Sequence, residues 1–403
     1  MHFIEINNQK EAEREFRKIG SDQAGARIMI PKAFFKIIKI DGLAPAPINI
    51  IKQLMLSLGG EVAAERGVIT HATPKSAILI MGTLKQFNGL IIKLKKHQFN
   101  LPRIASEIEE MLKKYFGTVK LQIGNKNYPI GKRTYLMGII NLTPDSFYDG
   151  GKFSDLSNAY AHALKLIGSG ADLIDIGGES SRPGSDPVDP KEEINRVVPL
   201  IKKIARRVPV SIDTRKASVA RAALDAGAVM VNDISGLRFD KKIATVIKEF
   251  NASVVIMHIK GTPKNMQDNP QYSDLIEEIH SYLKEGLEIA KNAGILNDRI
   301  IVDPGFGFGK AKNHNLDILK RLNELKSLGR PILIGTSRKS TIGKMLNCPP
   351  EACLFGTAAT VAAAIINGAD FVRVHDVDEM KKIAIMCDAI IRGSEDGEKR
   401  KES

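Results

Sequence analysis

The stretch 300–310, IIVDPGFGFGK, joins a short apolar run to a glycine-rich turn. Branched apolar residues over 300–302 are typical of a buried strand, which ends at the carboxylate of Asp303. Beyond Pro304, glycine and phenylalanine alternate up to Lys310. Glycine lets the backbone approach a ligand closely, and phenylalanine rings offer apolar walls. The turn suggests a phosphate cradle, although a P-loop follows a stricter pattern. What Asp303 faces therefore depends on the rest of the chain.

The same unit, an apolar strand with a polar carboxyl end, recurs from Tyr135 onward, and amphipathic stretches of helical period separate the copies. Eight alternations over about 250 residues are typical of a (β/α)8 TIM barrel. An open doubly wound sheet is the alternative, but it rarely has eight such even units. The predicted strands are 135–140, 173–178, 210–213, 230–234, 253–258, 300–303, 332–337 and 371–376. The predicted helices are 157–168, 191–206, 216–226, 240–250, 274–293, 315–328, 356–367 and 377–392.

The residues before the barrel predict a smaller α/β domain. Over 1–130 we expect helices at 47–58 and 101–115, a strand at 77–82 and a basic strand at 91–95. No acid, base or nucleophile constellation stands out there, which favours an assembly or stabilising role. We therefore divide the chain into an N-terminal α/β extension (1–130), a TIM-barrel catalytic domain (131–392) and a charged, disordered tail (393–403).

Composition limits the function classes. The net charge is +13, and residues 1–130 carry 20 Lys and Arg against 11 Asp and Glu. These lysines are interleaved with apolar residues, so we read a solvated face and do not expect nucleic acid as a partner. We expect no membrane segment and no signal peptide. Cys348, Cys353 and Cys387 show no paired spacing and indicate buried thiols in a reducing cytoplasm.

Polar side chains stand at the carboxyl ends of nearly all the predicted strands. One or two such residues could simply cap helices, but eight ends meet at one mouth of a barrel and predict a binding pocket there. Asp213, Asn232 and Asp303 suit a flat ring with several adjacent N–H donors, such as an amino-pyrimidinone. Lys339 could donate to the ring, and Arg373 could stack on it. The other polar ends are Asn141, Glu179 to Gly184, Asp233, His258, Ser337 to Ser340 and His375.

At this point the residues resemble a family, the dihydropteroate synthases, over Tyr135 to about Ala389. The matching motifs are MGIINLTPDSFYDGG, DIGGESSRPGS, SIDTRK, VNDISG, MHIKGTPKNMQ, DPGFGFGK, GTSRKS and RVHDV, in the family's order. The resemblance implies that the amine of 4-aminobenzoate displaces diphosphate from (7,8-dihydropterin-6-yl)methyl diphosphate. The product would be 7,8-dihydropteroate, in folate biosynthesis, with Mg²⁺ required. It also suggests a homodimer paired through outer helices.

The resemblance assigns roles residue by residue. Asn141 would bind Mg²⁺ beside the diphosphate. Catalysis would fall to Asp303, Lys339, Asp213, Arg182 and Asp149, with Asp149 closing the site from the first loop. The substrate-binding set would be Ser181, Pro183, Asp213, Asn232, Met257, Asp303, Phe308, Lys339, Ser340, Arg373 and His375. Ser340, at a helix N-terminus, would receive the carboxylate of 4-aminobenzoate. Asp303 would then face the pterin, which replaces the phosphate-cradle interpretation, and Lys310 would face solvent.

Two positions depart from the family: Ser181 stands where threonine is usual, and Lys260 where glutamine is usual, which adds a positive charge near the mouth. Three alternatives stay open. A pterin-binding methyltransferase would share the barrel but lack SRPG, GTSRKS and RVHDV, and it usually works beside a cobalamin domain. Some archaeal relatives could couple a ribosylated arylamine instead of 4-aminobenzoate. From another class, the basic extension could bind nucleic acid.

Overall fold

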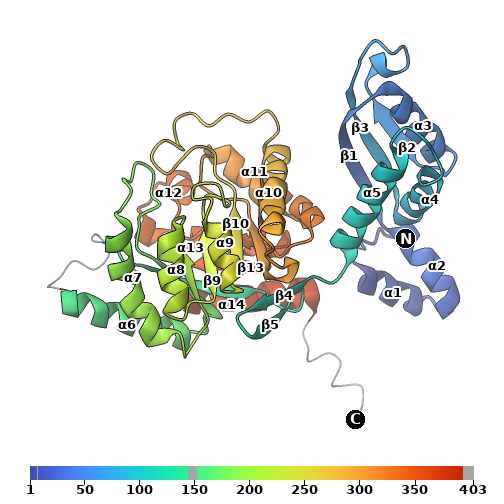
Figure 1. Cartoon of the computed structure of the whole chain (residues 1–403). Helices are drawn as coiled ribbons and strands as arrows, with labels where there is room; N and C mark the ends of the chain where they lie inside the picture. The colour runs from blue at the N-terminus through green and yellow to red at the C-terminus, as the bar shows by residue number, and fades with distance from the viewer. Residues whose placement is uncertain (7, 144–151, 394–403) are drawn as a thin grey trace. The chain divides into compact units, whose positions relative to one another are not determined.

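The computed structural model describes residues 1–6, 8–143 and 152–393. The chain forms two compact units, Met1–Lys113 and Lys114–Ser403 (Figure 1), and each is described by itself.

The second unit is a (β/α)8 barrel. Its eight strands are hydrogen-bonded in the order β11-β10-β9-β8-β7-β6-β13-β12, with every pair parallel. A parallel bridge between Val302 and Ile332 joins the two ends of that order and closes the barrel. The strands are β6 (Tyr135–Asn141), β7 (Leu173–Gly177), β8 (Val210–Asp213), β9 (Met230–Asp233), β10 (Ser253–Met257), β11 (Ile300–Asp303), β12 (Leu333–Ile334) and β13 (Phe371–Val374).

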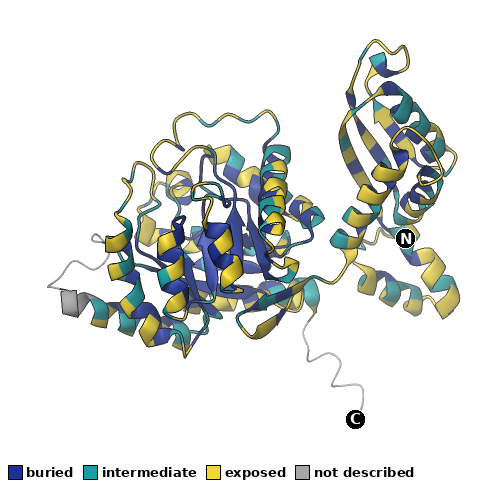
Figure 2. Cartoon of the chain, viewed as in Figure 1, coloured by how far each residue is buried: buried dark blue, intermediate teal, exposed yellow. Residues whose placement is uncertain are grey.

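Helices cover the outside of the barrel (Figure 2), and most of them contribute buried apolar residues to the core against the strands. The α-helices are α6 (Lys152–Gly168), α7 (Pro190–Ile204), α8 (Ala217–Asp225), α9 (Ile243–Glu249), α10 (Leu275–Asn292), α11 (Lys312–Arg321), α12 (Ser340–Leu346), α13 (Leu354–Ile366) and α14 (Val377–Arg392). Short 3-10 turns are η3 (Asn297–Arg299), η4 (Leu322–Leu328) and η5 (Pro350–Ala352). Each of the eight predicted strands and helices of the barrel has its counterpart here. Helix α12 is additional, a short turn directly after the predicted strand 332–337.

A β-hairpin joins the hydrophobic core at the amino-terminal ends of the barrel strands. It consists of β4 (Lys120–Ile123) and β5 (Lys126–Pro129). Its buried Leu121, Ile123 and Tyr128 pack in one cluster with barrel residues such as Tyr135 and Phe371. The predicted boundary at 130 would separate this hairpin from the core that it completes. In the structure the division falls at Lys113, because the hairpin buries its apolar face in the barrel.

The first unit is a three-stranded antiparallel sheet with helices packed on it. The basic strand expected at 91–95 was wrong: 91–94 is the end of α4, whose Leu90, Ile91 and Leu94 are buried at helical spacing. The elements are α1 (Gln9–Lys18), α2 (Gln23–Ala33), β1 (Phe35–Leu43), α3 (Pro45–Leu56), β2 (Glu61–Ala64), η1 (Arg66–Val68), β3 (Ser76–Thr83), α4 (Leu84–Leu94) and α5 (Leu101–Phe116). In the described part of the chain, no helix has both the length and the apolar character needed to span a bilayer.

Candidate active site

The side chains that point into the barrel follow the two-residue period of its strands. Residues two apart on a strand share a face. The lower inward layer is apolar and includes Met137, Leu173, Met230, Val255 and Ile301. One step further toward the carboxyl ends, the same face carries Asp175, Asp213, Asn232, Asp303 and Arg373. The outward positions between them, such as Ile174, Ile212 and Val302, belong to the core under the helices.

Strand register brings the polar ends into one row. Asn141 pairs with Gly177, Gly177 with Asp213, and Asp213 with Asn232. A Cβ placed on Gly177 would lie 3.5 Å from Asp213 Cβ and 3.6 Å from Asn141 Oδ1. The glycine thus leaves open the space between the predicted metal ligand and the first predicted pterin carboxylate.

A buried ion-pair network lies beneath this row, centred on Asp175. The Oδ2 atom of Asp175 accepts hydrogen bonds from Arg373 Nε at 2.6 Å and from Asn232 Nδ2 at 2.9 Å. A second guanidinium nitrogen of Arg373 donates to Asp213 Oδ2 at 2.7 Å. Asp175 thereby fixes the orientation of two predicted pterin ligands.

Asp175 is not among the residues predicted from the sequence, because it lies inside its strand and not at the carboxyl end. A signal was available: an aspartate between apolar residues of a buried strand must have a partner. It also stands two residues before Gly177, on the inward face.

Two oxygen atoms of this network have no hydrogen-bond partner among the described residues: Asp175 Oδ1 and Asn232 Oδ1. Both are buried acceptors, and such atoms are costly to leave unpaired. A ligand that reaches this depth would therefore find two acceptors without a donor.

Burial shifts the protonation of the two carboxylates above the network. It raises the pKa of Asp213 to about 7, against the opposing charge of Arg373. Burial likewise raises the pKa of Asp303 to about 6, although the backbone N–H of Gly305 donates to Asp303 Oδ1 at 2.6 Å. Both groups hold their charge weakly until a donor-rich ligand arrives.

Lys339 lies against the aromatic wall of the pocket. Its Nζ stands 4.0 Å from the centre of the Phe308 ring, a cation–π contact. Burial, together with the positive charge of Arg373, lowers the pKa of Lys339 to about 8. Phe308 and Met257 pack with Ile234, Ile259 and Met266 into one apolar cluster. The predicted donor and the predicted wall are therefore side by side.

The expectation that Lys310 faces solvent was wrong. Its side chain is 2% exposed, and its Nζ bonds to His258 Nδ1 and to the carbonyl oxygen of Phe308, both at 2.8 Å. Burial lowers the pKa of Lys310 well below its ordinary value, and it lowers that of His258 to about 2. Lys310 closes the glycine-rich turn from inside, so it sets the position of Phe308.

The last strand places His375 beside the loop that carries Lys339. Its Nδ1 lies 3.0 Å from Ser337 Oγ, and burial, with the nearby charge of Arg373, lowers its pKa to about 3. The imidazole is therefore neutral at physiological pH and offers a hydrogen bond rather than a charge.

Lys260, expected to add charge near the mouth, is instead ion-paired with Glu278 at 2.9 Å.

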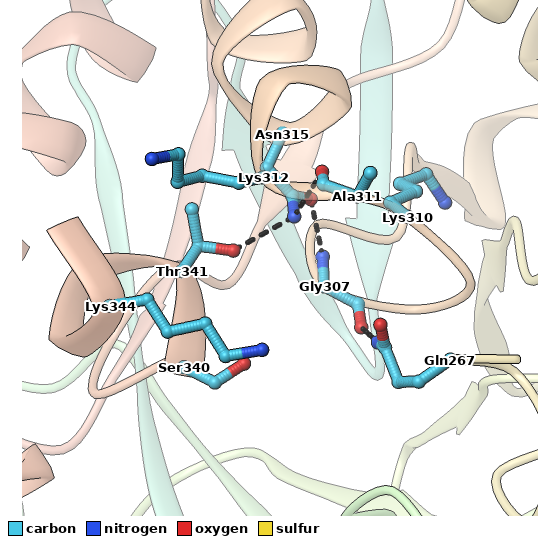
Figure 3. A pocket seen from close by; sticks show the side chains of 9 residues that line it. All are labelled: Gln267, Gly307, Lys310, Ala311, Lys312, Asn315, Ser340, Thr341 and Lys344. Carbon is cyan, nitrogen blue, oxygen red and sulfur yellow. Dashed lines mark hydrogen bonds between the residues drawn. The ribbon is translucent and has the colours of Figure 1, made fainter. Parts of the chain in front are cut away.

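A hollow of about 70 Å³ opens beside Ser340 (Figure 3). Within it, Asn315 Nδ2 donates to Thr341 Oγ1, and Asn315 Oδ1 accepts from the N–H of Gly307. The ammonium groups of Lys312 and Lys344 give the hollow a positive character suited to an anionic substituent. It is lined by Gln267, Gly307, Lys310, Ala311, Lys312, Asn315, Ser340, Thr341 and Lys344.

The loop after β7 holds Ser181, Arg182 and Pro183, of which the last two are exposed. A buried cluster fastens its base: Lys216 Nζ reaches Glu193 at 2.7 Å and Glu179 at 2.5 Å. The N–H of Gly184 also donates to the carbonyl oxygen of Pro263. Among the described residues, the guanidinium of Arg182 has no hydrogen bond or ion pair, so its charge is free to meet a substrate. Asp149 and the tail residues 394–403 lie outside the described residues.

Comparison with known proteins identifies the family of this barrel. The chain matches the pterin binding enzyme family over residues 137–375. It is 50% identical over 275 residues to the dihydropteroate synthase of Clostridium beijerinckii, covering 68% of this chain and 100% of that one. The chain belongs to the dihydropteroate synthases. The solved dihydropteroate synthase of Xanthomonas albilineans with 4-aminobenzoic acid is 39% identical, with a TM-score of 0.63, over 68% of this chain and 98% of that one.

One dihydropteroate synthase relative also bears on the N-terminal unit. A probable bifunctional folylpolyglutamate synthase/dihydropteroate synthase of Halobacterium salinarum is 39% identical over 347 residues, or 86% of this chain and 42% of that longer protein. This match is longer than the barrel unit. It therefore takes in part of residues 1–113, so part of the extension has a counterpart in this relative.

Proposed function

We propose that this dihydropteroate synthase joins 4-aminobenzoate to (7,8-dihydropterin-6-yl)methyl diphosphate through the polar row of the barrel mouth. The observation that carries the proposal is the convergence of Asp213, Asn232 and Asp303 on one inward face, over the Asp175–Arg373 network. The acceptors match the adjacent N–H groups of an amino-pyrimidinone edge. Lys339 would donate to the ring from the side of Phe308, and the guanidinium of Arg373, held by Asp175 and Asp213, would stack on the face of the ring.

The chemistry that suits these residues is early breakage of the C–O bond to diphosphate. The pterin methylene then becomes cationic, and Asp303 and Asp213 stabilise the positive charge delocalised into the ring. His375, neutral in the free enzyme, donates a hydrogen bond to the leaving group. The amine nitrogen of 4-aminobenzoate attacks the methylene carbon and loses a proton. Ser181, Arg182 and Pro183 cover the second substrate and exclude water, which competes for the cation.

The second substrate fits the hollow beside Ser340. The ring of 4-aminobenzoate would lie on Phe308, and its carboxylate would lie at Ser340, where Lys312 and Lys344 add positive charge. A solved relative binds 4-aminobenzoic acid, which supports this amine. A ribosylated arylamine is the alternative amine, and the assay below separates the two.

The test is a diphosphate-release assay with the pterin diphosphate, run with 4-aminobenzoate, with the ribosylated arylamine and with no amine. Release that depends on 4-aminobenzoate, together with formation of 7,8-dihydropteroate, is expected. Equal release in all three arms would point to simple hydrolysis. Release only with the ribosylated arylamine would reassign the amine.

A Mg²⁺ ion fits the mouth through a single protein ligand. Asn141 presents its amide oxygen beside the space left by Gly177, and Mg²⁺ takes few protein ligands when substrate phosphates and water complete its shell. The described residues hold no group of three His, Cys, Asp or Glu side chains that could bind a metal alone. When bound, the ion would supply charge neutralisation for the diphosphate.

Removal of Asn141 provides a test of that ligand. We expect Asn141→Ala to raise the Mg²⁺ concentration for half-maximal turnover by about tenfold or more, with near-normal turnover at saturating metal. A titration of Mg²⁺ after treatment with a chelator measures it. An unchanged metal requirement in the variant would remove Asn141 from the metal site.

Pterin affinity should depend on pH in one direction. Asp213 and Asp303, with pKa values of about 7 and about 6, must be ionised to accept from the ring. Affinity for (7,8-dihydropterin-6-yl)methanol should therefore be full above pH 7 and weaken on acidification, by about tenfold per pH unit for each group that must lose its proton. Calorimetric titration from pH 5 to 8 measures this. Affinity that rises on acidification would contradict the assignment.

We also propose a homodimer in the cytoplasm. Helices α13 and α14 carry the exposed apolar side chains Phe355, Ile366, Ile385, Met386 and Ile390, which suit pairing through outer helices. The three thiols are free, as is usual in a reducing compartment. For the N-terminal unit we propose an assembly or stabilising role, since it has a hydrophobic core of its own.

A further inference from the structure

Two cysteines that are five residues apart meet at the turn between α12 and α13. The Sγ atoms of Cys348 and Cys353 lie 2.8 Å apart. Cys353 is fully buried, whereas Cys348 is partly exposed. All three cysteines are free thiols, as expected, but Cys348 and Cys353 are in contact and Cys348 is only partly buried. The third thiol, Cys387, is buried on α14 and has no thiol partner in the described structure.

The backbone holds both cysteines in place. The N–H of Cys348 donates to the carbonyl oxygen of Gly343 at 3.1 Å, after α12 ends on the left-handed Asn347. The carbonyl oxygen of Cys353 accepts from the N–H of Thr357 at 2.8 Å, in the first turns of α13. Two prolines stiffen the segment between them. The sulfur atoms thus need to approach by less than 1 Å to reach the disulfide bond length of about 2.0 Å.

We propose that Cys348 and Cys353 form a reversible intramolecular disulfide when the enzyme meets a hydroperoxide. The partly exposed Cys348 thiolate attacks one peroxide oxygen, which gives a sulfenic acid and releases an alcohol, or water when the oxidant is hydrogen peroxide. The Cys353 sulfur then attacks the Cys348 sulfur, the S–S bond forms and water leaves. The two thiols lose two electrons, which the peroxide gains.

The division of roles follows from access and proton affinity. Oxidant can reach Cys348 but not the buried Cys353. The hydrogen bond with Cys348 raises the pKa of Cys353 to about 11, so Cys353 keeps its proton while Cys348 reacts. In the cytoplasm such bonds are usually transient and respond to redox state.

The bond would tie the end of α12 to the start of α13. The same two helices border the loop that carries Lys339 and Ser340, since Thr357 Oγ1 accepts from the N–H of Arg338 at 3.3 Å. Oxidation should therefore slow hydrogen exchange over 343–353 and raise the Tm by a few degrees, as expected for a short closed loop. A thiol reductant should reverse both effects.

Peptide mapping tests the proposal directly. Trypsin cuts after Lys344 and Arg373, so both cysteines fall in peptide 345–373, whereas Cys387 falls in peptide 383–392. The full-length enzyme is reduced, freed of reductant and treated with stoichiometric hydrogen peroxide. We expect peptide 345–373 to lose two hydrogen atoms, to resist alkylation and to regain both thiols with dithiothreitol.

Variants locate the bond. Cys387→Ser should still lose the two hydrogens, whereas Cys353→Ser should not and should instead yield a trappable sulfenic acid on Cys348. The proposal is overturned if peptide 345–373 keeps two alkylatable thiols while its methionine is oxidised. A covalent dimer on a non-reducing gel would equally overturn it. The wild-type peptide decides the question even if a serine variant fails to fold.

Discussion

Replacing Asp303 with Asn should lower turnover on the order of 10²- to 10³-fold, because the variant loses the charge nearest the developing cation. The fold should be kept, since the amide oxygen can still accept from the N–H of Gly305 as Asp303 Oδ1 does. The measurement is kcat and kcat/KM for diphosphate release, with the Tm as a check on folding. Burial raises the pKa of Asp303 to about 6. The wild-type enzyme should therefore lose turnover as the pH falls below about 6, where Asp303 becomes protonated.

Asp317→Asn is the matched control. Asp317 is an exposed aspartate on α11, the helix that follows the glycine-rich turn, so the same chemical change there should leave turnover within about twofold, as surface changes usually do. If Asp303→Asn retained wild-type turnover, the pterin would not bind against β11, and the proposed position of the substrate in the barrel would be wrong.

The second large effect is expected on stability. Arg373→Met leaves Asp175 and Asp213 buried without their cation, which should lower the free energy of unfolding by about 3–5 kcal/mol. The additional change Asp175→Asn should recover part of the loss, because one uncompensated charge disappears. The deficit should narrow as the pH falls below 7, since the pKa of Asp213 lies near there and a protonated carboxyl needs no cation.

Urea denaturation measures this effect, with hydrogen exchange separating barrel peptides from residues 1–113. Arg221→Met is the control: Arg221 pairs with Glu249 on the surface, both about half exposed, and such pairs contribute about 0–1 kcal/mol. A loss for Arg373→Met no larger than for Arg221→Met would mean that the network does not stabilise the barrel.

The barrel was readable from sequence because its signal repeats. Strands such as 300–303 and helices such as 377–392 recur at regular spacing, and nearly every strand end carries a polar residue. The fold and the gathering of Asn141, Asp213, Asn232 and Asp303 at one mouth therefore follow from the pattern. The motifs that resemble the dihydropteroate synthases also predicted the family, and the comparisons confirm it.

Contacts between side chains of distant segments could not be predicted from the sequence. Asp175 and Arg373 are 198 residues apart and meet only because β6 lies between β7 and β13. Lys310 looked solvent-facing because it follows a loop, yet it turns back under that loop to His258. Cys348 and Cys353 are close in sequence, but their contact depends on how α12 ends. Residues 91–95 combine lysine with branched apolar residues, so helix and strand periods compete over so short a span.

The hairpin β4–β5 packs against the amino-terminal end of the barrel, while the polar row lies at the carboxyl-terminal end. The chain therefore enters the barrel unit at the end opposite the polar row. In evolutionary terms, this arrangement makes the barrel a module that tolerates fusion. The segment before the hairpin can be replaced or lengthened without any change in the polar residues at the carboxyl-terminal ends of the strands. The match to the Halobacterium relative covers 42% of that protein, so it carries further sequence outside the shared part.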